Sequence, residues 1–276
     1  MRKQVQLVAL ALALAGLLLV ASACAENGEE VGIEPVAAVP ASATTAAEHG
    51  ATAAPVATPS PASDLPAKRV AVSAEEILRG PADVPKVSLV INAGSGYPPA
   101  TELLEILTEK GVKTTFFLMG WWAERNPDLV RRIQAEGHEI ASHGYQVFDL
   151  TLVSDAEVTE DLERADAVIA GITGQSTRPL WSPSAGYRDA RVRGIAARLG
   201  YRPILWTQDS GDWRENATAD GVFRQAMAGA VNGSIIVLHL DSPQSRAATA
   251  ATLGRLIDAL RERDLEPVTI TELVGE

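Results

Sequence analysis

Apolar and polar residues alternate in two regular patterns along the last two thirds of the chain. Short runs rich in apolar, β-branched and aromatic residues predict buried strands. These runs lie at 86–92, 113–118, 139–141, 179–183, 204–206, 234–239 and 266–270. Between them, apolar residues recur at helical spacing at 98–110, 126–137, 154–171, 189–199, 220–231 and 247–263. Strands that alternate with helices predict a parallel α/β architecture, either an open sheet or a barrel.

Polar side chains stand at the C-terminal ends of several predicted strands. They are Asn92, His143, Ser182, Asp209 and His239. In parallel α/β folds this edge of the sheet carries the ligand site, because the strand ends and the loops after them converge there. We therefore expect these side chains to lie around one site.

The N-terminal residues follow a different pattern. A basic start, Met1–Lys3, precedes the apolar run Leu7–Val20, and three small residues then precede Cys24. This order is typical of a bacterial lipoprotein signal peptide over residues 1–23, with Cys24 as the lipidated residue. Ordinary signal-peptidase cleavage and a retained anchor helix are the alternatives. The pattern predicts an exported lipoprotein that is anchored to a membrane of the bacterial cell envelope through Cys24.

Residues 24–80 are rich in alanine, proline, threonine, serine and glutamate and show no apolar period. Such a composition buries too little apolar surface to fold, which predicts a disordered tether. A short strand and turn at 70–79 is expected before the folded domain, which we place at 81–276. With a single cysteine, the chain cannot form an internal disulfide.

The charge and aromatic content narrow the classes of partner. Lysine and arginine number 24 against 35 aspartate and glutamate residues, a formal net charge of −11. A nucleic-acid partner is disfavoured, because phosphates require a basic face. The five tryptophans suit stacking on sugar rings as well as ordinary packing in the core.

Four stretches carry a family resemblance between Val87 and Leu273. They read Thr-Phe-Phe-Leu-Met-Gly at 115–120, Gly-His-Glu-Ile-Ala-Ser-His at 137–143, Asp-Ser-Gly-Asp-Trp at 209–213 and Gly-Ser-Ile-Ile-Val-Leu-His at 233–239. In this order the chain resembles the polysaccharide deacetylase (NodB-homology) family. The resemblance implies a distorted, incomplete (β/α) barrel. It also implies hydrolysis of N- or O-acetyl groups on chitin-like, xylan or peptidoglycan chains.

The resemblance implies a divalent metal, usually zinc, held by one Asp and two His, but this chain departs from that motif. The metal positions are occupied by Ala93, His143 and Val147. Alanine and valine offer no lone pair, so His143 is a lone remnant of a site that needs three protein ligands. We therefore predict no cofactor.

The neighbouring catalytic positions have changed as well. Asn92 stands where the family has its base Asp, and an amide is not basic enough to deprotonate water, so this position is predicted to be non-functional in catalysis. Ser182 replaces the Arg that orients that base. A buried Arg without its carboxylate partner would be unfavourable, so the two changes are consistent with each other.

The other half of the implied site is retained. Asp212 and His239 match the family's acid pair, and they are interpreted either as a remnant of that pair or as a structural hydrogen-bond pair. Trp213 and Val237 would form an apolar wall of the substrate site. Trp181 is predicted at the rim, as are Trp121 and Trp122, where indole rings can stack on sugars.

A rearranged metal site would have to use His143, Asp149 and Asp209, although Asp149 is better explained as a cap for the segment after it. His138 is expected to be a hydrogen-bonded, half-buried residue. The sequence thus predicts a membrane-tethered, deacetylase-like lipoprotein without metal-dependent activity, which binds a cell-wall or extracellular polysaccharide or a partner protein. The alternative is an active hydrolase of acetyl groups with zinc or another divalent metal in the rearranged site.

Overall fold

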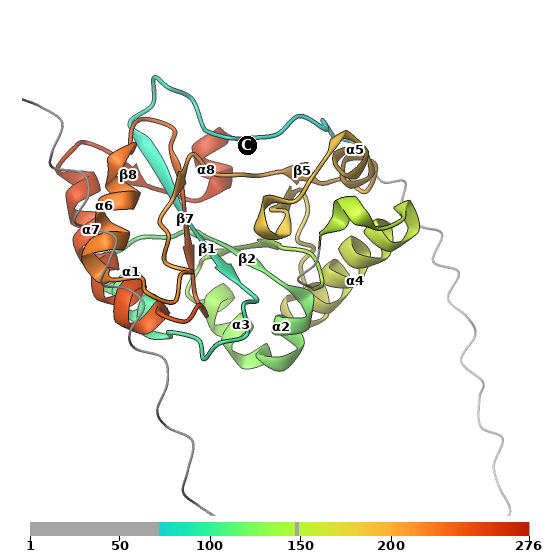
Figure 1. Ribbon diagram of the computed structural model, residues 1–276, viewed down its shortest axis with the longest axis horizontal. Helices are drawn as coiled ribbons and strands as arrows, with labels where there is room; N and C mark the ends of the chain where they lie inside the picture. Colours follow the sequence, from blue (N-terminus) through green and yellow to red (C-terminus); the bar gives the residue numbers. More distant parts are fainter. Residues whose placement is uncertain (1–71, 147–148, 276) are drawn as a thin grey trace, which may run out of the picture. The chain divides into compact units, whose positions relative to one another are not determined.

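The computed structural model describes residues 72–146 and 149–275 (Figure 1). Its centre is a parallel sheet with the strand order β5-β4-β3-β2-β1-β7-β6, and β8 pairs with β1 outside that path. The strands are β1 (Lys86–Ala93), β2 (Thr115–Leu118), β3 (Glu139–Ser142), β4 (Leu180–Trp181), β5 (Arg202–Pro203), β6 (Gln208–Asp209), β7 (Ile235–His239) and β8 (Glu266–Pro267). The sheet curls, and its end strands β5 and β6 do not pair with each other. The predicted incomplete (β/α) barrel is therefore confirmed.

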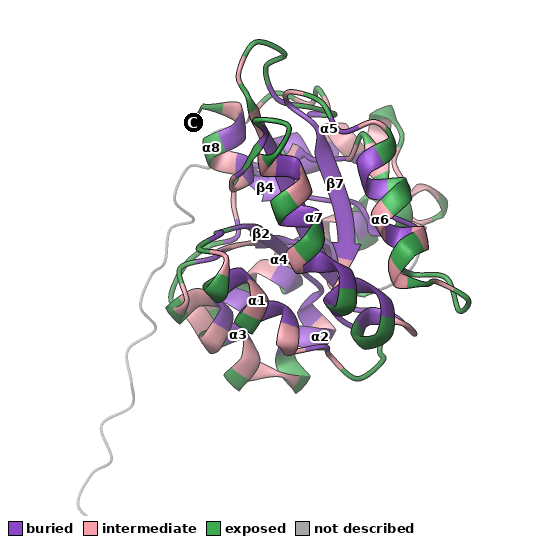
Figure 2. Ribbon diagram, turned by 90° about the vertical axis from the view of Figure 1, so that its left-hand side faces the viewer, coloured by how far each residue is buried: buried purple, intermediate pink, exposed green. Residues whose placement is uncertain are grey.

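Helices pack around this sheet. They are α1 (Glu102–Glu109), α2 (Gly120–Arg125), α3 (Pro127–Ala135), α4 (Asp155–Thr173), α5 (Ala190–Arg198), α6 (Ala219–Ala228), α7 (Ala251–Arg261) and α8 (Ile270–Val274). Short helical turns occur at η1 (Leu150–Leu152), η2 (Ser184–Gly186) and η3 (Ser245–Ala250). In Figure 1, α1, α6 and α7 gather on one side, and α4 and α5 on the other. Figure 2 shows that β2, β4 and β7 are largely buried, while the helices expose their outer faces.

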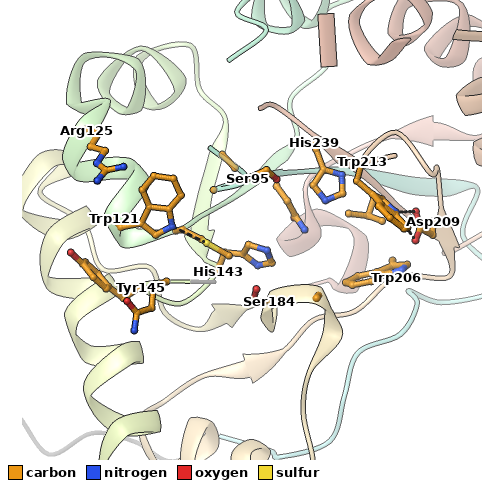
Figure 3. A pocket seen from close by; sticks show the side chains of 17 residues that line it. Ser95, Trp121, Arg125, His143, Tyr145, Ser184, Trp206, Asp209, Trp213 and His239 are labelled. Atoms are coloured by element: carbon orange, nitrogen blue, oxygen red, sulfur yellow. Dashed lines mark hydrogen bonds between the residues drawn. The ribbon is translucent and has the colours of Figure 1, made fainter. Parts of the chain in front are cut away.

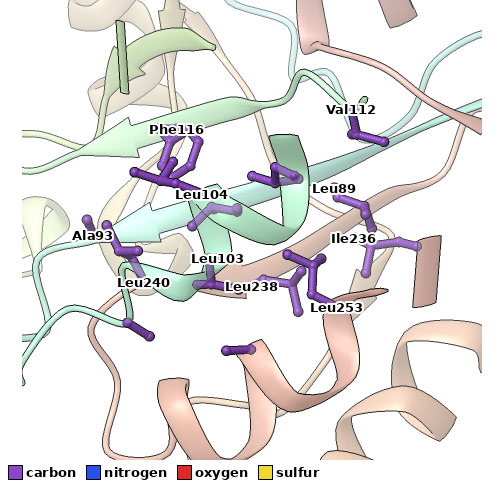
Figure 4. Close-up of a cluster of buried hydrophobic side chains, with 14 of the residues drawn as sticks. Leu89, Ala93, Leu103, Leu104, Val112, Phe116, Ile236, Leu238, Leu240 and Leu253 are labelled. Carbon is purple, nitrogen blue, oxygen red and sulfur yellow. The ribbon is translucent and has the colours of Figure 1, made fainter. Parts of the chain in front are cut away.

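Two hydrophobic clusters lie on opposite faces of β1. Leu89, Ile91 and Ala93 belong to the larger cluster between the sheet and the helices (Figure 4). Val90 belongs to the smaller cluster inside the barrel, which α8 closes with Ile270 and further apolar residues. Because side chains alternate along a strand, Asn92 follows Val90 on the inner face, at the end of the strand where the cavity opens.

The end of the predicted tether is corrected by the structure. Ile77 is buried, forms an isolated parallel bridge with Ile204 and packs in the cluster inside the barrel. Glu76 forms an ion pair with Arg188 at 2.9 Å. The segment 72–80 is thus part of the folded domain, and the expected boundary at residue 80 was placed too late. The rest of the predicted tether, the signal peptide 1–23 and Cys24 lie outside the described residues.

Three element predictions differ from the structure. The run at 204–206 is a connection between β5 and β6, and the final strand ends at Pro267 before α8 begins. The short helix α2 was not predicted, because two adjacent tryptophans in a six-residue helix produce no apolar period. Within the described ranges, none of these helices is long and apolar enough to span a membrane.

His138 provides a test of the fold's dependence on pH. Its Nδ1 accepts the Thr114 N–H at 3.3 Å, its side chain is buried, and burial lowers its pKa to about 4. Between pH 6.5 and 4, His138 is therefore mostly protonated in the unfolded chain and mostly neutral in the folded chain. As the pH falls through that range, His138 lowers the free energy of unfolding. The expected hydrogen-bonded histidine is confirmed, although it is more deeply buried than predicted.

We predict that His138→Asn, which keeps an acceptor near the Thr114 N–H, reduces the acid loss of stability. Between pH 6.5 and 4.5 the free energy of unfolding should fall by about 2 kcal/mol less in the variant than in the wild type. Urea titrations at several pH values measure this difference. Parallel pH profiles for the two proteins would show that His138 is not a source of acid sensitivity.

Candidate functional site

A cavity of about 940 Å³ opens at the C-terminal ends of the strands (Figure 3). The sequence-predicted residues that line it are Asn92, Ala93, His143, Asp209, Trp213, Val237 and His239. These residues come from β1, from the ends of β6 and β7, and from the loops after β3 and β6. The expected convergence of strand ends on one site is thus what the structure shows for these side chains.

His143 follows β3 and is held by the backbone rather than by a side chain. Its Nδ1 lies 2.7 Å from the carbonyl oxygen of Ser182, so Nδ1 must donate and Nε2 carries a free lone pair. Burial lowers the pKa of His143 to about 4, so the ring is neutral at pH 7. Ser182 itself is buried and is not among the residues that line the cavity. Its side chain stands where the family resemblance implies an Arg, and its contribution to the site is its backbone carbonyl group.

The loop after His143 is anchored from α4. The Asp161 carboxylate accepts the backbone N–H groups of Tyr145 at 2.9 Å and Gln146 at 3.2 Å. Burial raises the pKa of Asp161 to about 6, although these two donors act in the opposite direction. Gly144 has a positive φ of 81°, and a Cβ there would lie 2.6 Å from the Asp161 carboxylate, so glycine is required. Asp161 thus fixes the loop that presents His143.

His239 and Asp212 form a close pair on the other side of the cavity. Asp212 is fully buried, and its carboxylate accepts the His239 backbone N–H and its Nδ1–H, both at 2.7 Å. The Thr249 hydroxyl donates to the same carboxylate at 2.8 Å. Burial acts to lower the pKa of His239, but Asp212 outweighs it, so the pKa is raised. The Nε2 edge of the ring is left to face the cavity.

Asn92 lies beside His239, because the two are register partners in the parallel pair β1–β7. The Asn92 side chain is 3% exposed, and its amide oxygen is buried without a hydrogen-bond partner. The loop that follows is held by Asp241, whose carboxylate accepts the N–H groups of Gly94 and Gly96 at 3.0 and 2.8 Å. Asp241 lies two residues after His239 and is buried. The sequence analysis did not select it, although it follows a buried strand as the other site residues do.

Three indoles and a tyrosine surround the cavity. Trp121 and Tyr145 lie on one side, and Trp206 and Trp213 on the other (Figure 3). Trp213 is 48% exposed, and its Nε1 donates to both oxygens of Asp209 at 3.1 and 3.2 Å. Trp206 was missed because it lies in a run interpreted as a strand. The rim therefore offers aromatic faces on both sides of the opening.

The prediction for Trp181 is wrong. Its side chain is fully buried and packs with Leu150 and Tyr201 in a separate cluster below η1. Trp122 is likewise buried in the core and does not line the cavity. The sequence places both tryptophans near strand ends, and therefore near the open end of the barrel. It does not tell whether a side chain there points into the cavity or into the core.

The metal implied by the resemblance does not fit the residues present. Ala93 is 1% exposed and packs in the core, and Val147, which lies outside the described residues, has a hydrocarbon side chain. Asp149 accepts the Thr151 N–H and hydroxyl at 2.9 and 2.7 Å, which confirms its expected role as a cap. Across residues 72–146 and 149–275, no three His, Cys, Asp or Glu side chains are grouped to hold a metal ion. One imidazole alone is too few for a zinc site.

Comparison with known proteins places this geometry in a family. The polysaccharide deacetylase family model matches residues 79–204. The uncharacterized protein YlxY of Bacillus subtilis is 32% identical over 205 residues, which cover 73% of this chain and 61% of that protein. The chain thus spans less than two thirds of YlxY. A chitooligosaccharide deacetylase of Sinorhizobium fredii is 32% identical over 189 residues, which cover 65% of this chain and 87% of the enzyme.

A solved structure with the same fold is that of BA3943 from Bacillus anthracis, described as a CE4 family pseudoenzyme. It is 29% identical, with a TM-score of 0.67 over 73% of this chain and 69% of that one. A mutant of BA3943 is described as having restored enzymatic activity, and it superimposes with a TM-score of 0.68. The curled parallel sheet, the order of the motifs and the extent of the match to the Sinorhizobium enzyme agree, and this chain belongs to the polysaccharide deacetylase family.

Proposed function

We propose that this protein is a deacetylase-fold lipoprotein that lacks metal-dependent deacetylase activity and binds a cell-wall or extracellular glycan in the cavity. The observation that carries the proposal is the donor set around His143. Ala93 and Asn92 stand where the family has its metal-binding and base carboxylates, and neither can perform those roles. Lipidation at Cys24 would tether the domain to a membrane of the cell envelope.

Hydrolysis in the family uses a water that is activated by a bound metal and an Asp base, and Ala93 and Asn92 supply neither the metal-binding carboxylate nor that base. Asn92 cannot take a proton near neutral pH. His143, whose Nε2 is free, is one ligand where three are needed. The name given to BA3943, a pseudoenzyme with the same fold, shows that loss of activity occurs within this family. It supports the same interpretation here.

Glycan binding is supported by the walls of the cavity. Trp121, Trp206 and Trp213 line the cavity of about 940 Å³. An indole ring combines an apolar face with a polar N–H edge, which suits the apolar and polar surfaces of a sugar ring. The relatives named as deacetylases act on chitooligosaccharide and peptidoglycan. We propose that this cavity binds a polysaccharide of the same chemical class.

Metal content tests the first half of the proposal. The purified wild-type protein should retain well under one equivalent of zinc after dialysis, because only His143 remains of the ligand set. Ala93→Asp combined with Val147→His restores three ligands and should retain about one equivalent. Elemental analysis measures both, and a rise in melting temperature on adding zinc should be confined to the double variant.

The same double variant in a His143→Ala background is the control and should lose the zinc again. A full equivalent of tightly held zinc in the wild-type protein, together with acetate release from an acetylated glycan that stops in His143→Ala, would overturn the proposal. That result would favour the alternative, an active hydrolase with a rearranged site.

Binding tests the second half. The full-length wild-type protein should sediment with insoluble peptidoglycan or chitin, and Trp213→Ala should weaken that binding about tenfold, because a stacked aromatic face contributes on the order of 1–2 kcal/mol. Leu152→Ala is the matched control, since Leu152 is 82% exposed and lies outside the cavity. If neither polysaccharide is retained, or if Leu152→Ala weakens binding as much as Trp213→Ala, the cavity is not a glycan site.

A further inference from the structure

One wall of the cavity is the short turn η2, which has a strained backbone. Ser184 and Ala185 of this turn line the cavity, as Trp206 does (Figure 3). Ala185 has a φ of 49° and a ψ of 16°, in the left-handed region that residues with a Cβ rarely adopt. Such a conformation costs on the order of 1–2 kcal/mol and persists only where surrounding contacts fix it. The contacts around this turn therefore help to shape the cavity.

Backbone hydrogen bonds close the turn, and an arginine holds it from outside. The Gly186 N–H donates to the Pro183 carbonyl at 3.0 Å. The Tyr187 N–H donates to the Ser184 carbonyl at 2.9 Å. Nη1 of Arg188 donates to the Gly186 carbonyl at 3.1 Å. The conformation of the turn thus depends on where the Arg188 guanidinium is placed.

Glu76 fixes that guanidinium. Nε and Nη2 of Arg188 donate to the two carboxylate oxygens of Glu76 at 3.1 and 2.9 Å, a bidentate pairing that sets both position and orientation. Nη1 of Arg193 lies 3.3 Å from the same carboxylate. The Glu76 side chain is 17% exposed, and the hydrogen bond from Arg188 lowers its pKa, so it is ionised at neutral pH. One guanidinium therefore joins Glu76 to the wall of the cavity.

Glu76 is itself held in place, because the next residue is docked in the core. The Ile77 N–H donates to the Pro203 carbonyl at 2.9 Å, and the Ile77 carbonyl accepts the Leu205 N–H at 3.0 Å. The Ile77 side chain belongs to the cluster inside the barrel, against which Trp206 also packs. The segment 72–80 thus supports two neighbouring parts of the cavity wall, one through Glu76 and one through Ile77.

We propose that Glu76 is a positioning residue of the glycan site, which acts through Arg188 to hold the η2 wall in its strained conformation. Glu76 does not line the cavity itself. The inference rests on the proposed glycan-binding function, because a fixed wall matters to binding only if a glycan enters the cavity. It gives a role in that function to a segment that the sequence pattern assigned to the tether.

Hydrogen exchange measures the hold on the turn without any ligand. In the full-length protein, Glu76→Ala should speed exchange at the Gly186 and Tyr187 amides about tenfold, because Arg188 is no longer aimed at the turn. Arg188→Lys should have the same effect, since an ammonium keeps the charge but not the fork that joins Glu76 to Gly186. Thermal melts establish that both variants are folded.

Glu266→Ala is the matched control. Glu266 accepts a bidentate pair from Arg261 at 3.1 and 2.8 Å, and Arg261 also donates to the Lys110 carbonyl at 3.0 Å. The arrangement is the same as at Glu76, but none of these three residues lines the cavity. This variant should leave exchange at Gly186 and Tyr187 unchanged.

Sedimentation with insoluble peptidoglycan and with chitin measures the effect on binding. Glu76→Ala and Arg188→Lys should each weaken binding about threefold or more, because the wall is no longer preorganised, whereas Glu266→Ala should bind as the wild type does.

Three results would overturn the inference: unchanged exchange in Glu76→Ala, an equal rise in Glu266→Ala, or wild-type binding in Glu76→Ala. If the wild type retains neither polysaccharide while exchange changes as expected, the proposed function fails and the hold of Glu76 on the wall stands.

Discussion

The architecture depends on the pairing of β1 with β2 on one side and β7 on the other, with β8 at its start. A strand in this position is covered on both faces, so nearly all of its residues must be apolar. Leu89 and Ile91 meet the helices, and Val90 meets the interior of the barrel. Only Asn92 and Ala93, the last residues of the strand, also line the cavity, and they form its floor. A change at Asn92 therefore alters the site, whereas a change at Ala93 also alters the edge of the larger cluster.

The same constraint explains which features could be predicted from the sequence. A doubly covered strand is a continuous apolar run, so the predicted bounds of β1 and β7 each differ from the structure by a single residue at one end. The rule that ligand sites lie at the C-terminal ends of parallel strands then selected Asn92, His143 and His239, which the structure brings together. Both arguments rely on local patterns that each segment carries by itself.

The features that could not be predicted depend on contacts between distant segments. Trp181 and Trp206 have equally apolar neighbours, yet one is fully buried and the other lines the cavity. Which of them faces the opening is decided by the curl of the sheet at β4 and β5, where strands of two residues give no periodicity. Ile77 is a single apolar residue in a polar segment, so its docking against Ile204 leaves no mark on the sequence pattern. Asp241 holds a loop almost 150 residues away, at Gly94 and Gly96.

The two sides of the cavity differ in how firmly hydrogen bonds fix their side chains. Asp212 satisfies two donors of His239 and the Thr249 hydroxyl, so its removal would leave buried donors without an acceptor whether or not catalysis takes place. His143 depends only on a backbone carbonyl, which any residue at position 182 supplies. Ala93 adds one more apolar contact to the core. The Asp212–His239 half of the site is thus fixed by the stability of the fold, whereas no such hydrogen-bond network fixes the side chains at positions 92 and 93. Retention of the Asp212–His239 pair is for this reason no evidence of hydrolysis.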